Sequence, residues 1–169
     1  MRQTPVFAVL ALYLGLVAQV RAQSTSPRTN TTTQGTVMHA AGSFDVKITP
    51  QAPSDIATTA GLGRMTIDKE FHGDLDGTSK GEMLAAMIDA NGAAVYVALE
   101  KVTGTLGGHT GTFVLHHTGT ATKNGQALTV GVAPESGTGG FAGMTGTMKI
   151  NIVDKKHFYE FEYTLPAHP

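Results

Sequence analysis

The sequence predicts an all-β fold, a closed eight-stranded antiparallel barrel, and three observations carry this prediction. Short runs in which apolar and polar residues alternate with a period of two follow one another from Gly42 onward, which is the pattern of half-buried strands. The runs begin roughly 10 to 20 residues apart, too close for crossover helices, so neighbouring strands are expected to be antiparallel. A glycine-dense stretch at 136–147 is typical of a tight, packed corner, with Phe141 as its one large anchor.

Eight strands follow from the alternation, although one of them has an ambiguous pattern. Within residues 81–89, apolar pairs at 83/84 and 87/88 also fit a helix. The glycines before this segment and the turn at 90–92 favour a strand there. The expected strands are centred on residues 44–48, 65–71, 74–88, 95–99, 113–117, 128–132, 148–152 and 159–165.

The start of the chain has the three parts of a secretory signal peptide, which we expect to span residues 1–22. Arg2 precedes an apolar run at 5–20, and Val20-Arg21-Ala22 fits a small-x-small cleavage site. Residues 23–36 are rich in Ser, Thr, Asn and Gln and are expected to form a disordered leader. The barrel domain is then expected at 37–166, in a secreted or periplasmic protein.

Composition excludes several classes of site. The chain has no cysteine, so disulfides, thiolate metal sites and a cysteine nucleophile are excluded. Its formal net charge is −1 and no basic run exceeds Lys155-Lys156, so we expect no nucleic-acid partner, and no membrane partner after signal cleavage. No His-x-His pattern is present, so no metal site is expected, nor any cofactor. A homo-oligomer is left open.

Several motifs together resemble a known family. They are Gly63–Lys69, Phe71–Leu75, Thr78–Met83, Tyr96–Glu100, Gly111–His117 and the Gly-Thr-Gly-x-Phe-x-Gly corner at 137–143. In these motifs the chain is similar, over about 42–165, to the bacterial domain-of-unknown-function family 3224. That resemblance implies a barrel of the allene oxide cyclase-like or lipocalin-like kind. It implies no established activity, and no cyclase catalytic residue can be carried over.

Polar residues on the inward phase of the strands are the candidate site. Lys69 shares a phase with apolar neighbours, and the apolar phase of 113–117 turns His117 inward and His116 outward. Tyr96 and Glu100 share one phase, so they face the same side. The hairpin is expected to place Glu100 opposite residue 116 or 117. An inward Lys, Glu and His would form an ion-paired, acid/base group. Alternatively, the Lys and Glu head groups lie in water at the barrel mouth, and the His is a core residue.

Two further candidates are less defined by the pattern. The facing of Glu82 is undecided because it lies in the helix-like segment, and Tyr163 is expected in the core, where its hydroxyl could orient a ligand. The full set of candidate ligand-binding residues is Lys69, Glu82, Tyr96, Glu100, His117 and Tyr163.

The function hypothesis that best fits this pattern is binding of a small, apolar molecule inside the barrel, because an eight-stranded barrel is either filled by side chains or holds one small ligand. Tyr96, Glu100 and His117 would supply the few polar contacts. The alternatives are an isomerase or cyclase acting on an apolar substrate, and a structural or assembly barrel without a ligand. An open interior would separate the first two from the third.

Overall fold

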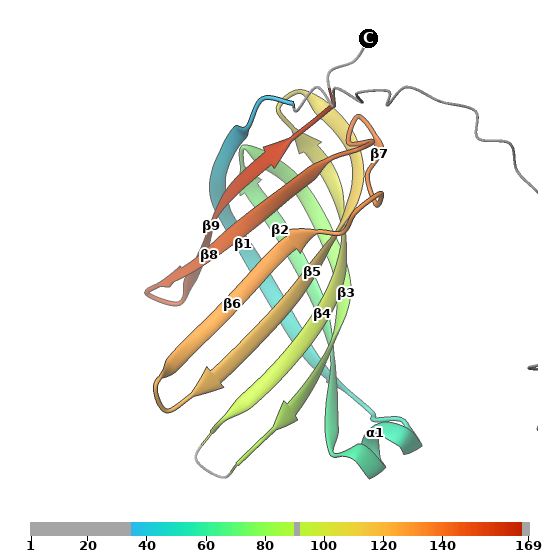
Figure 1. Ribbon diagram of the computed structural model, residues 1–169, viewed down its shortest axis with the longest axis vertical. Helices are drawn as coiled ribbons and strands as arrows, with labels where there is room; N and C mark the ends of the chain where they lie inside the picture. The colour runs from blue at the N-terminus through green and yellow to red at the C-terminus, as the bar shows by residue number, and fades with distance from the viewer. Residues whose placement is uncertain (1–34, 90–91, 167–169) are drawn as a thin grey trace, which may run out of the picture. The chain divides into compact units, whose positions relative to one another are not determined.

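The structure is a computed structural model that describes residues 35–89 and 92–166 of the chain, and these residues form an antiparallel β-barrel (Figure 1). Eight strands lie side by side in the order β4-β3-β2-β1-β9-β8-β6-β5, and pairing of β4 with β5 closes the ring. The predicted fold class is confirmed. The elements are β1 (Met38–Gln51), α1 (Asp55–Ala60), β2 (Leu62–Gly73), β3 (Leu75–Met87), β4 (Ala94–Leu106), β5 (His109–Thr122), β6 (Gly125–Val132), β7 (Thr138–Gly139), β8 (Thr145–Val153) and β9 (Lys156–Thr164). The predicted signal peptide and nearly all of the predicted leader lie outside the described residues.

The segment with the ambiguous pattern is a strand. β3 runs to Met87 and pairs with β2 on one side and β4 on the other. Two ladders of backbone hydrogen bonds hold it extended, so tertiary pairing overrides the local preference of Met, Leu and Ala for a helix.

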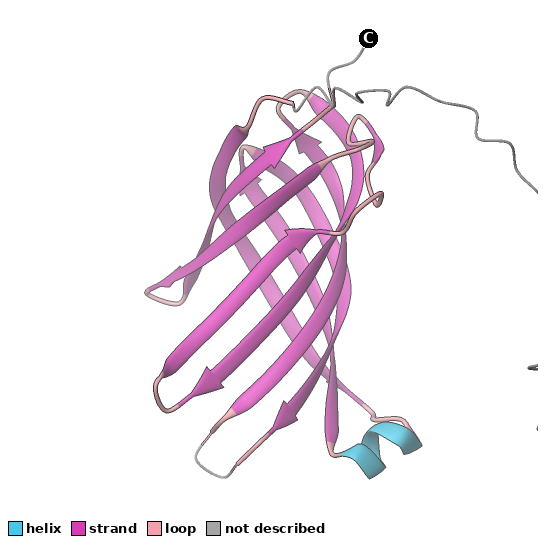
Figure 2. Cartoon of the chain, viewed as in Figure 1, coloured by secondary structure: helices cyan, strands magenta, loops and turns pink. Residues whose placement is uncertain are grey.

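One short helix was not predicted. The helix α1 lies between β1 and β2 (Figure 2). Ala57 N donates a hydrogen bond to Ser54 Oγ at 3.2 Å, and Gly61 ends the helix with φ 68°. A Ser before the helix and a Gly after it are the usual capping residues. Among the described residues, no helix has the length and apolar character that a membrane crossing requires.

The β4–β5 hairpin fixes the register around the candidate site. Its turn consists of Gly107 and Gly108, both at positive φ (58° and 79°), as a two-residue turn of the primed type requires. Leu106 therefore pairs with His109, and Glu100 pairs with Leu115. The expected partner, residue 116 or 117, is wrong by one or two positions, because the hairpin is centred between Gly107 and Gly108, slightly nearer to Glu100 than that pairing requires.

The glycine-dense corner packs as predicted. Phe141 is fully buried and meets Phe113 edge to face, with ring centroids 5.4 Å apart. Ser136 ties the corner to β5, because its hydroxyl donates to Ala133 O at 2.6 Å and accepts from Val114 N at 3.0 Å. The short strand β7 pairs with β5 and is not part of the eight-strand ring. The corner then leads into β8.

The barrel interior is filled at one end only. Toward the Gly107–Gly108 turn, inward side chains are at most 4% exposed; they are Phe71, Leu75, Val102, Leu106, Phe113, Leu115, Tyr159, Phe161 and Tyr163. Toward the far ends of β1, β3, β6 and β8, apolar side chains on the same inward phase are exposed, namely Ile48 (51%), Met87 (70%), Leu128 (43%) and Ile152 (64%). We call these two parts the packed half and the accessible half.

The seam between β6 and β8 contributes to this accessibility. Their registered pairing in the described residues is Gly131 with Thr147, and below it the two strands diverge in Figure 1. Leu128 and Ile152 lie on the two strands beyond this pairing, and both are exposed. The accessible half is therefore open to solvent toward the barrel end and beside this seam.

Candidate functional site

Three charged or titratable side chains meet inside the barrel, and we call them the central cluster: Lys69 on β2, Glu100 on β4 and His117 on β5. Lys69 Nζ lies 2.9 Å from Glu100 Oε1, and His117 Nε2 lies 3.5 Å from the same oxygen. Their exposed fractions are 6%, 0% and 5%. The alternative in which Lys69 and Glu100 extend into water at the barrel mouth is wrong. The two side chains point into the barrel and form a buried group with His117.

Strand register explains how these residues meet. Lys69 pairs with Ser79 and Glu100 pairs with Gly81, so β3 lies between the two charged residues. Gly81 presents no side chain there, and a Cβ at this position would come within 2.6 Å of Glu100 Cβ. His117 is two positions beyond Leu115, the partner of Glu100, on the same face of the sheet. Diagonal neighbours of this kind are within reach of long side chains.

Aromatic rings enclose the Lys69 ammonium group. Its Nζ lies 4.7 Å from the centroid of the Phe44 ring and 5.7 Å from that of Phe71. Both distances are within the range of cation–π attraction. The ammonium group is thus held between two ring faces and the Glu100 carboxylate, which fixes its position.

The electrostatic surroundings keep Glu100 ionised. Burial is the largest single influence and raises the pKa of Glu100, but interaction with His117 and the charge of Lys69 together outweigh it, so the pKa lies below its usual value. At 3.5 Å the Nε2–Oε1 distance is longer than an ordinary hydrogen bond. We therefore treat the His117 contact as an electrostatic one.

The cluster is short of hydrogen-bond partners. Within the described residues, Glu100 Oε2, His117 Nε2 and Ser79 Oγ are buried and have none. Ser79 is 1% exposed and lies opposite Lys69. Buried polar atoms are nearly always paired in folded proteins, so each unpaired atom needs an explanation.

Tyr96 extends the polar surface toward the accessible half. It lies on the inward phase of β4, is half-buried, and occupies the space left by Gly119, where a Cβ would overlap the Tyr96 ring. Burial, and then the negative charge of Glu100, raise the pKa of its hydroxyl. The hydroxyl is therefore protonated at neutral pH and can donate a hydrogen bond.

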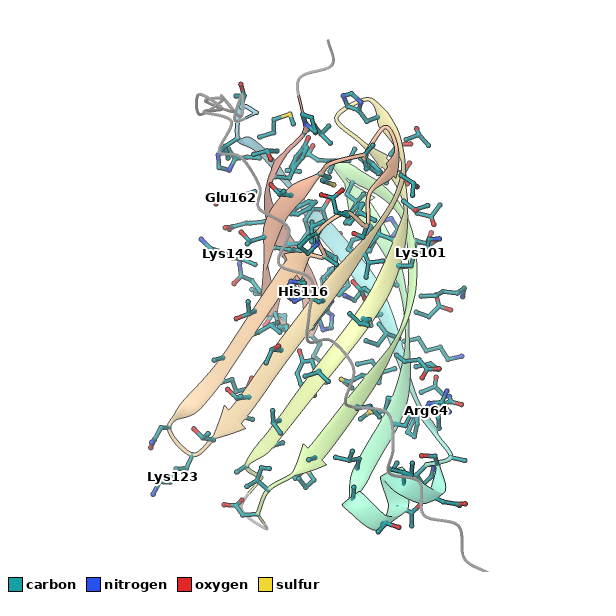
Figure 3. All side chains as sticks on the ribbon, turned by 45° about the vertical axis from the view of Figure 1, so that its right-hand side comes forward. Arg64, Lys101, His116, Lys123, Lys149 and Glu162 are labelled. Carbon is teal, nitrogen blue, oxygen red and sulfur yellow. The ribbon has the colours of Figure 1, made fainter. Side chains whose placement is uncertain are left out.

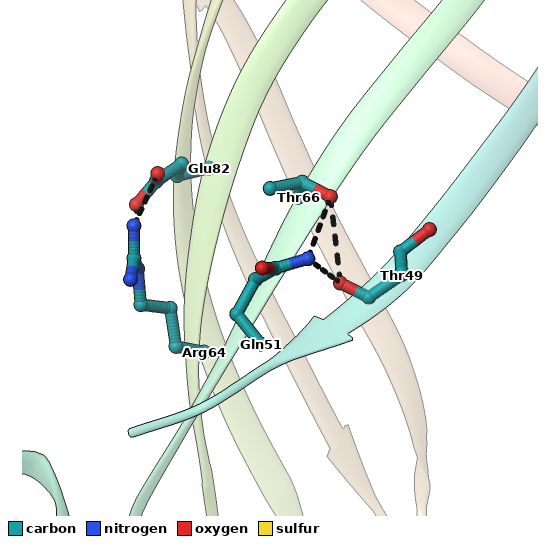
Figure 4. Close-up of polar contacts among 5 residues, drawn as sticks. All are labelled: Thr49, Gln51, Arg64, Thr66 and Glu82. Atoms are coloured by element: carbon teal, nitrogen blue, oxygen red, sulfur yellow. Dashed lines mark hydrogen bonds and ion pairs between the residues drawn. The ribbon is translucent and has the colours of Figure 1, made fainter. Parts of the chain in front are cut away.

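The remaining two candidates lie elsewhere. Tyr163 belongs to the packed half, where its ring stacks on Phe161 at 5.3 Å, away from the central cluster. Glu82 lies on the outer face, which settles its facing, and it forms a two-point ion pair with Arg64 (Figure 4), with Arg64 Nε donating to Oε2 at 2.8 Å. The hydrogen bond from Arg64 lowers the pKa of Glu82. Neither residue contributes to an interior site.

The outer face carries a second feature that sequence reasoning missed. A hollow of about 630 Å³ is lined by Arg64, Glu82, Leu84, Val97, Ala98, Leu99, His116, His117 and Thr118. Its apolar members Leu84, Val97 and Leu99 are 43%, 52% and 61% exposed. Figure 3 shows His116 and Arg64 on the outside of the barrel at this face. Apolar residues on both phases of 95–99 were the signal that could have revealed it.

The described part of the chain lacks the side-chain arrangements that bind metal ions. No three His, Asp or Glu side chains come together there in an arrangement that could hold an ion. The central cluster offers one carboxylate and one imidazole beside an ammonium group, whose positive charge opposes a cation.

Comparison with known proteins identifies the family. The family model described as "Protein of unknown function (DUF3224)" matches residues 40–163. A solved structure of a DUF3224 protein of unknown function from Shewanella oneidensis MR-1 is 44% identical, with a TM-score of 0.71, and the match covers 78% of this chain and all of that one. No curated protein matches the chain. The likeness to allene oxide cyclase stays a prediction. By both the family model and the solved relative, the chain belongs to the DUF3224 family.

Proposed function

We propose that the barrel binds a small, largely apolar molecule in its accessible half, with a polar group of that molecule placed at the central cluster. One observation carries the proposal: a buried, ionised carboxylate with an unpaired oxygen lies inside a barrel whose accessible half carries inward-facing apolar side chains that are exposed. Small-molecule sites combine these two features, an apolar lining and a few convergent polar groups.

The stability of the fold gives no reason for the cluster. Replacing a buried ion pair with apolar residues of similar volume is often neutral or stabilising. Each buried polar atom without a partner costs roughly 1–3 kcal/mol, and Glu100 Oε2, His117 Nε2 and Ser79 Oγ are three such atoms. A bound polar group would offset part of that cost, which an empty site bears in full.

The exposed apolar side chains of the accessible half would also be stabilised by a bound molecule. Ile48, Met87, Leu128 and Ile152 leave water only when something covers them. Covering apolar surface contributes roughly 25 cal/mol per Å². A ligand with an apolar body would supply that cover while Tyr96 and the cluster orient its polar end.

The lowered pKa of Glu100 favours binding over proton-transfer catalysis. A general base works best when its pKa is near the working pH. A carboxylate with a pKa below its usual value is a weaker base than an ordinary one, so an isomerase or cyclase would gain little from it. The catalytic alternative therefore ranks second.

The absence of tryptophan allows a direct test of where an apolar molecule binds. The chain has no Trp, so Ala85→Trp and Leu84→Trp each introduce one fluorescent reporter. Ala85 faces the interior beside Tyr96, and Leu84 is exposed on the outer face. The two positions are adjacent on β3, which makes the variants a matched pair.

The probe is 8-bromooctan-1-ol, whose bromine quenches tryptophan only on close contact. Ala85 is four residues from Gly81, the partner of Glu100, which is roughly 13 Å along a strand. A chain with its hydroxyl at the cluster would bring the bromine close to Ala85. We expect saturable quenching in Ala85→Trp and none in Leu84→Trp. Quenching confined to Leu84→Trp would place the ligand in the outer hollow and overturn the proposal.

A further inference from the structure

We propose that the polar group of the ligand is a neutral hydroxyl, and not a carboxylate or an ammonium group. This inference rests on the proposed function, because it names the chemical class of the molecule bound at the same site. It comes from the charges and the unpaired atoms of the central cluster.

The charges of the cluster are already matched. The Lys69 ammonium group and the Glu100 carboxylate are 2.9 Å apart and neutralise each other. His117 directs Nε2 toward the same Glu100 oxygen, Oε1, at 3.5 Å. Lys69 is therefore not free to hold an incoming anion, because its ammonium group already faces the Glu100 carboxylate.

The unpaired atoms call for a donor. Glu100 Oε2 has no hydrogen-bond partner in the described residues, and a carboxylate oxygen can only accept. A ligand hydroxyl can donate to Oε2 and accept from a neighbouring donor. Lys69 Nζ is one such neighbour, since an ammonium group has three N–H donors and Glu100 uses one of them.

Charged head groups fit less well for opposite reasons. A ligand carboxylate has no proton to donate and would stand beside the Glu100 carboxylate, and like charges placed together inside a protein repel strongly. A ligand ammonium group could donate to Oε2, but it would stand beside Lys69 Nζ. A hydroxyl avoids both repulsions and makes both kinds of hydrogen bond.

The test compares three head groups on one chain in the Ala85→Trp protein, which leaves the cluster unaltered. The probes are 8-bromooctan-1-ol, 8-bromooctanoate and 8-bromooctan-1-amine, each titrated near neutral pH with tryptophan quenching as the readout. We expect the alcohol to bind about tenfold or more tighter than either charged probe.

The outcomes separate the two proposals. If 8-bromooctanoate or 8-bromooctan-1-amine binds as tightly as the alcohol, the hydroxyl inference is wrong while the interior binding site stands. If none of the three quenches Ala85→Trp, the proposed function fails and the inference fails with it.

A charge-removing variant gives a second, independent readout. In Glu100→Gln, added to Ala85→Trp, Lys69 loses its counter-ion, so the preference should reverse and 8-bromooctanoate should bind about tenfold or more tighter than it does with Glu100 present. Glu82→Gln is the matched control, because Glu82 pairs with Arg64 on the outer face and the head-group ranking should not change. An unchanged ranking in Glu100→Gln would overturn the role assigned to this carboxylate.

Discussion

Removing the charges of Lys69 and Glu100 one at a time or together separates a structural role from a functional one. With Nζ and Oε1 2.9 Å apart, the gross attraction is ~6 kcal/mol at an effective dielectric constant of about 20. Taking both ions out of water costs several kcal/mol each, which cancels most of that gain. The pair is therefore expected to add little net stability.

The single and double variants should behave very differently. Lys69→Met leaves the fully buried Glu100 carboxylate without its ammonium partner and is expected to lower the free energy of unfolding by about 3–5 kcal/mol. Lys69→Met combined with Glu100→Leu removes both charges and should restore the free energy of unfolding to within about 1 kcal/mol of the unsubstituted protein.

Urea denaturation of the two single variants and the double variant gives the coupling energy directly. The outer pair Arg64 and Glu82 serves as control, because both side chains are partly exposed, and the same substitutions there should change the free energy of unfolding much less than Lys69→Met does, in any combination. A double variant at Lys69 and Glu100 that stays as unstable as Lys69→Met would show that the fold needs this pair, and the energetic case for a ligand would lose its basis.

Three other outcomes are expected. Phe141→Ala removes a fully buried ring and should lower the free energy of unfolding by about 3–5 kcal/mol in urea denaturation. Phe158→Ala is the control, because this side chain is 40% exposed, and it should lower the free energy by under about 1 kcal/mol. Equal losses in the two variants would mean that Phe141 does not anchor the corner. The pKa of Glu100 is lowered in the folded protein, so the unfolded chain takes up a proton near pH 4.5 and the native protein only at lower pH. The contribution of Glu100 to stability is therefore present above about pH 4.5 and is lost as the pH falls further. Glu100→Gln should flatten this acid dependence in urea titrations, and an unaltered profile would contradict a lowered pKa for Glu100. The exported protein is expected to begin at Gln23, and an intact mass that retains Met1 would contradict the prediction of a cleaved signal.

Much of the site could be predicted because a strand has a simple period. Alternation assigns Lys69 and His117 to the inward phase, and closure of the barrel brings inward residues together. It left the phase of Glu100 open, because apolar residues occur on both phases of 95–99. The sequence pattern could not show how deeply these three side chains lie. Exposure depends on where the core stops being filled, and that depends on packing between strands far apart in the chain, such as β1 with β9.

The misses have local causes. The register of the β4–β5 hairpin depends on Gly107 and Gly108 forming a two-residue turn, and glycines at 104, 107, 108 and 111 offered several positions for it. The helix α1 had its capping signals, Ser54 and Gly61, but it has only six residues, which is too short for a periodic pattern. The strand β7 has two residues and is likewise too short to show a sequence pattern.

The two halves of the interior differ in how completely their side chains are buried, and this decides how substitutions in each should act. Rigid aromatic rings fill the packed half, with Phe113 in contact with both Phe141 and Phe161, so a change there leaves a cavity and acts through stability. Flexible thioethers, Met65 and Met83, line the accessible half, where they are partly buried, and methionine adapts to irregular shapes at low cost. Substitutions in the accessible half should therefore alter the quenching titrations more than the urea midpoint. The central cluster lies where these two regions meet, so it is the one place where a single substitution should change both measurements.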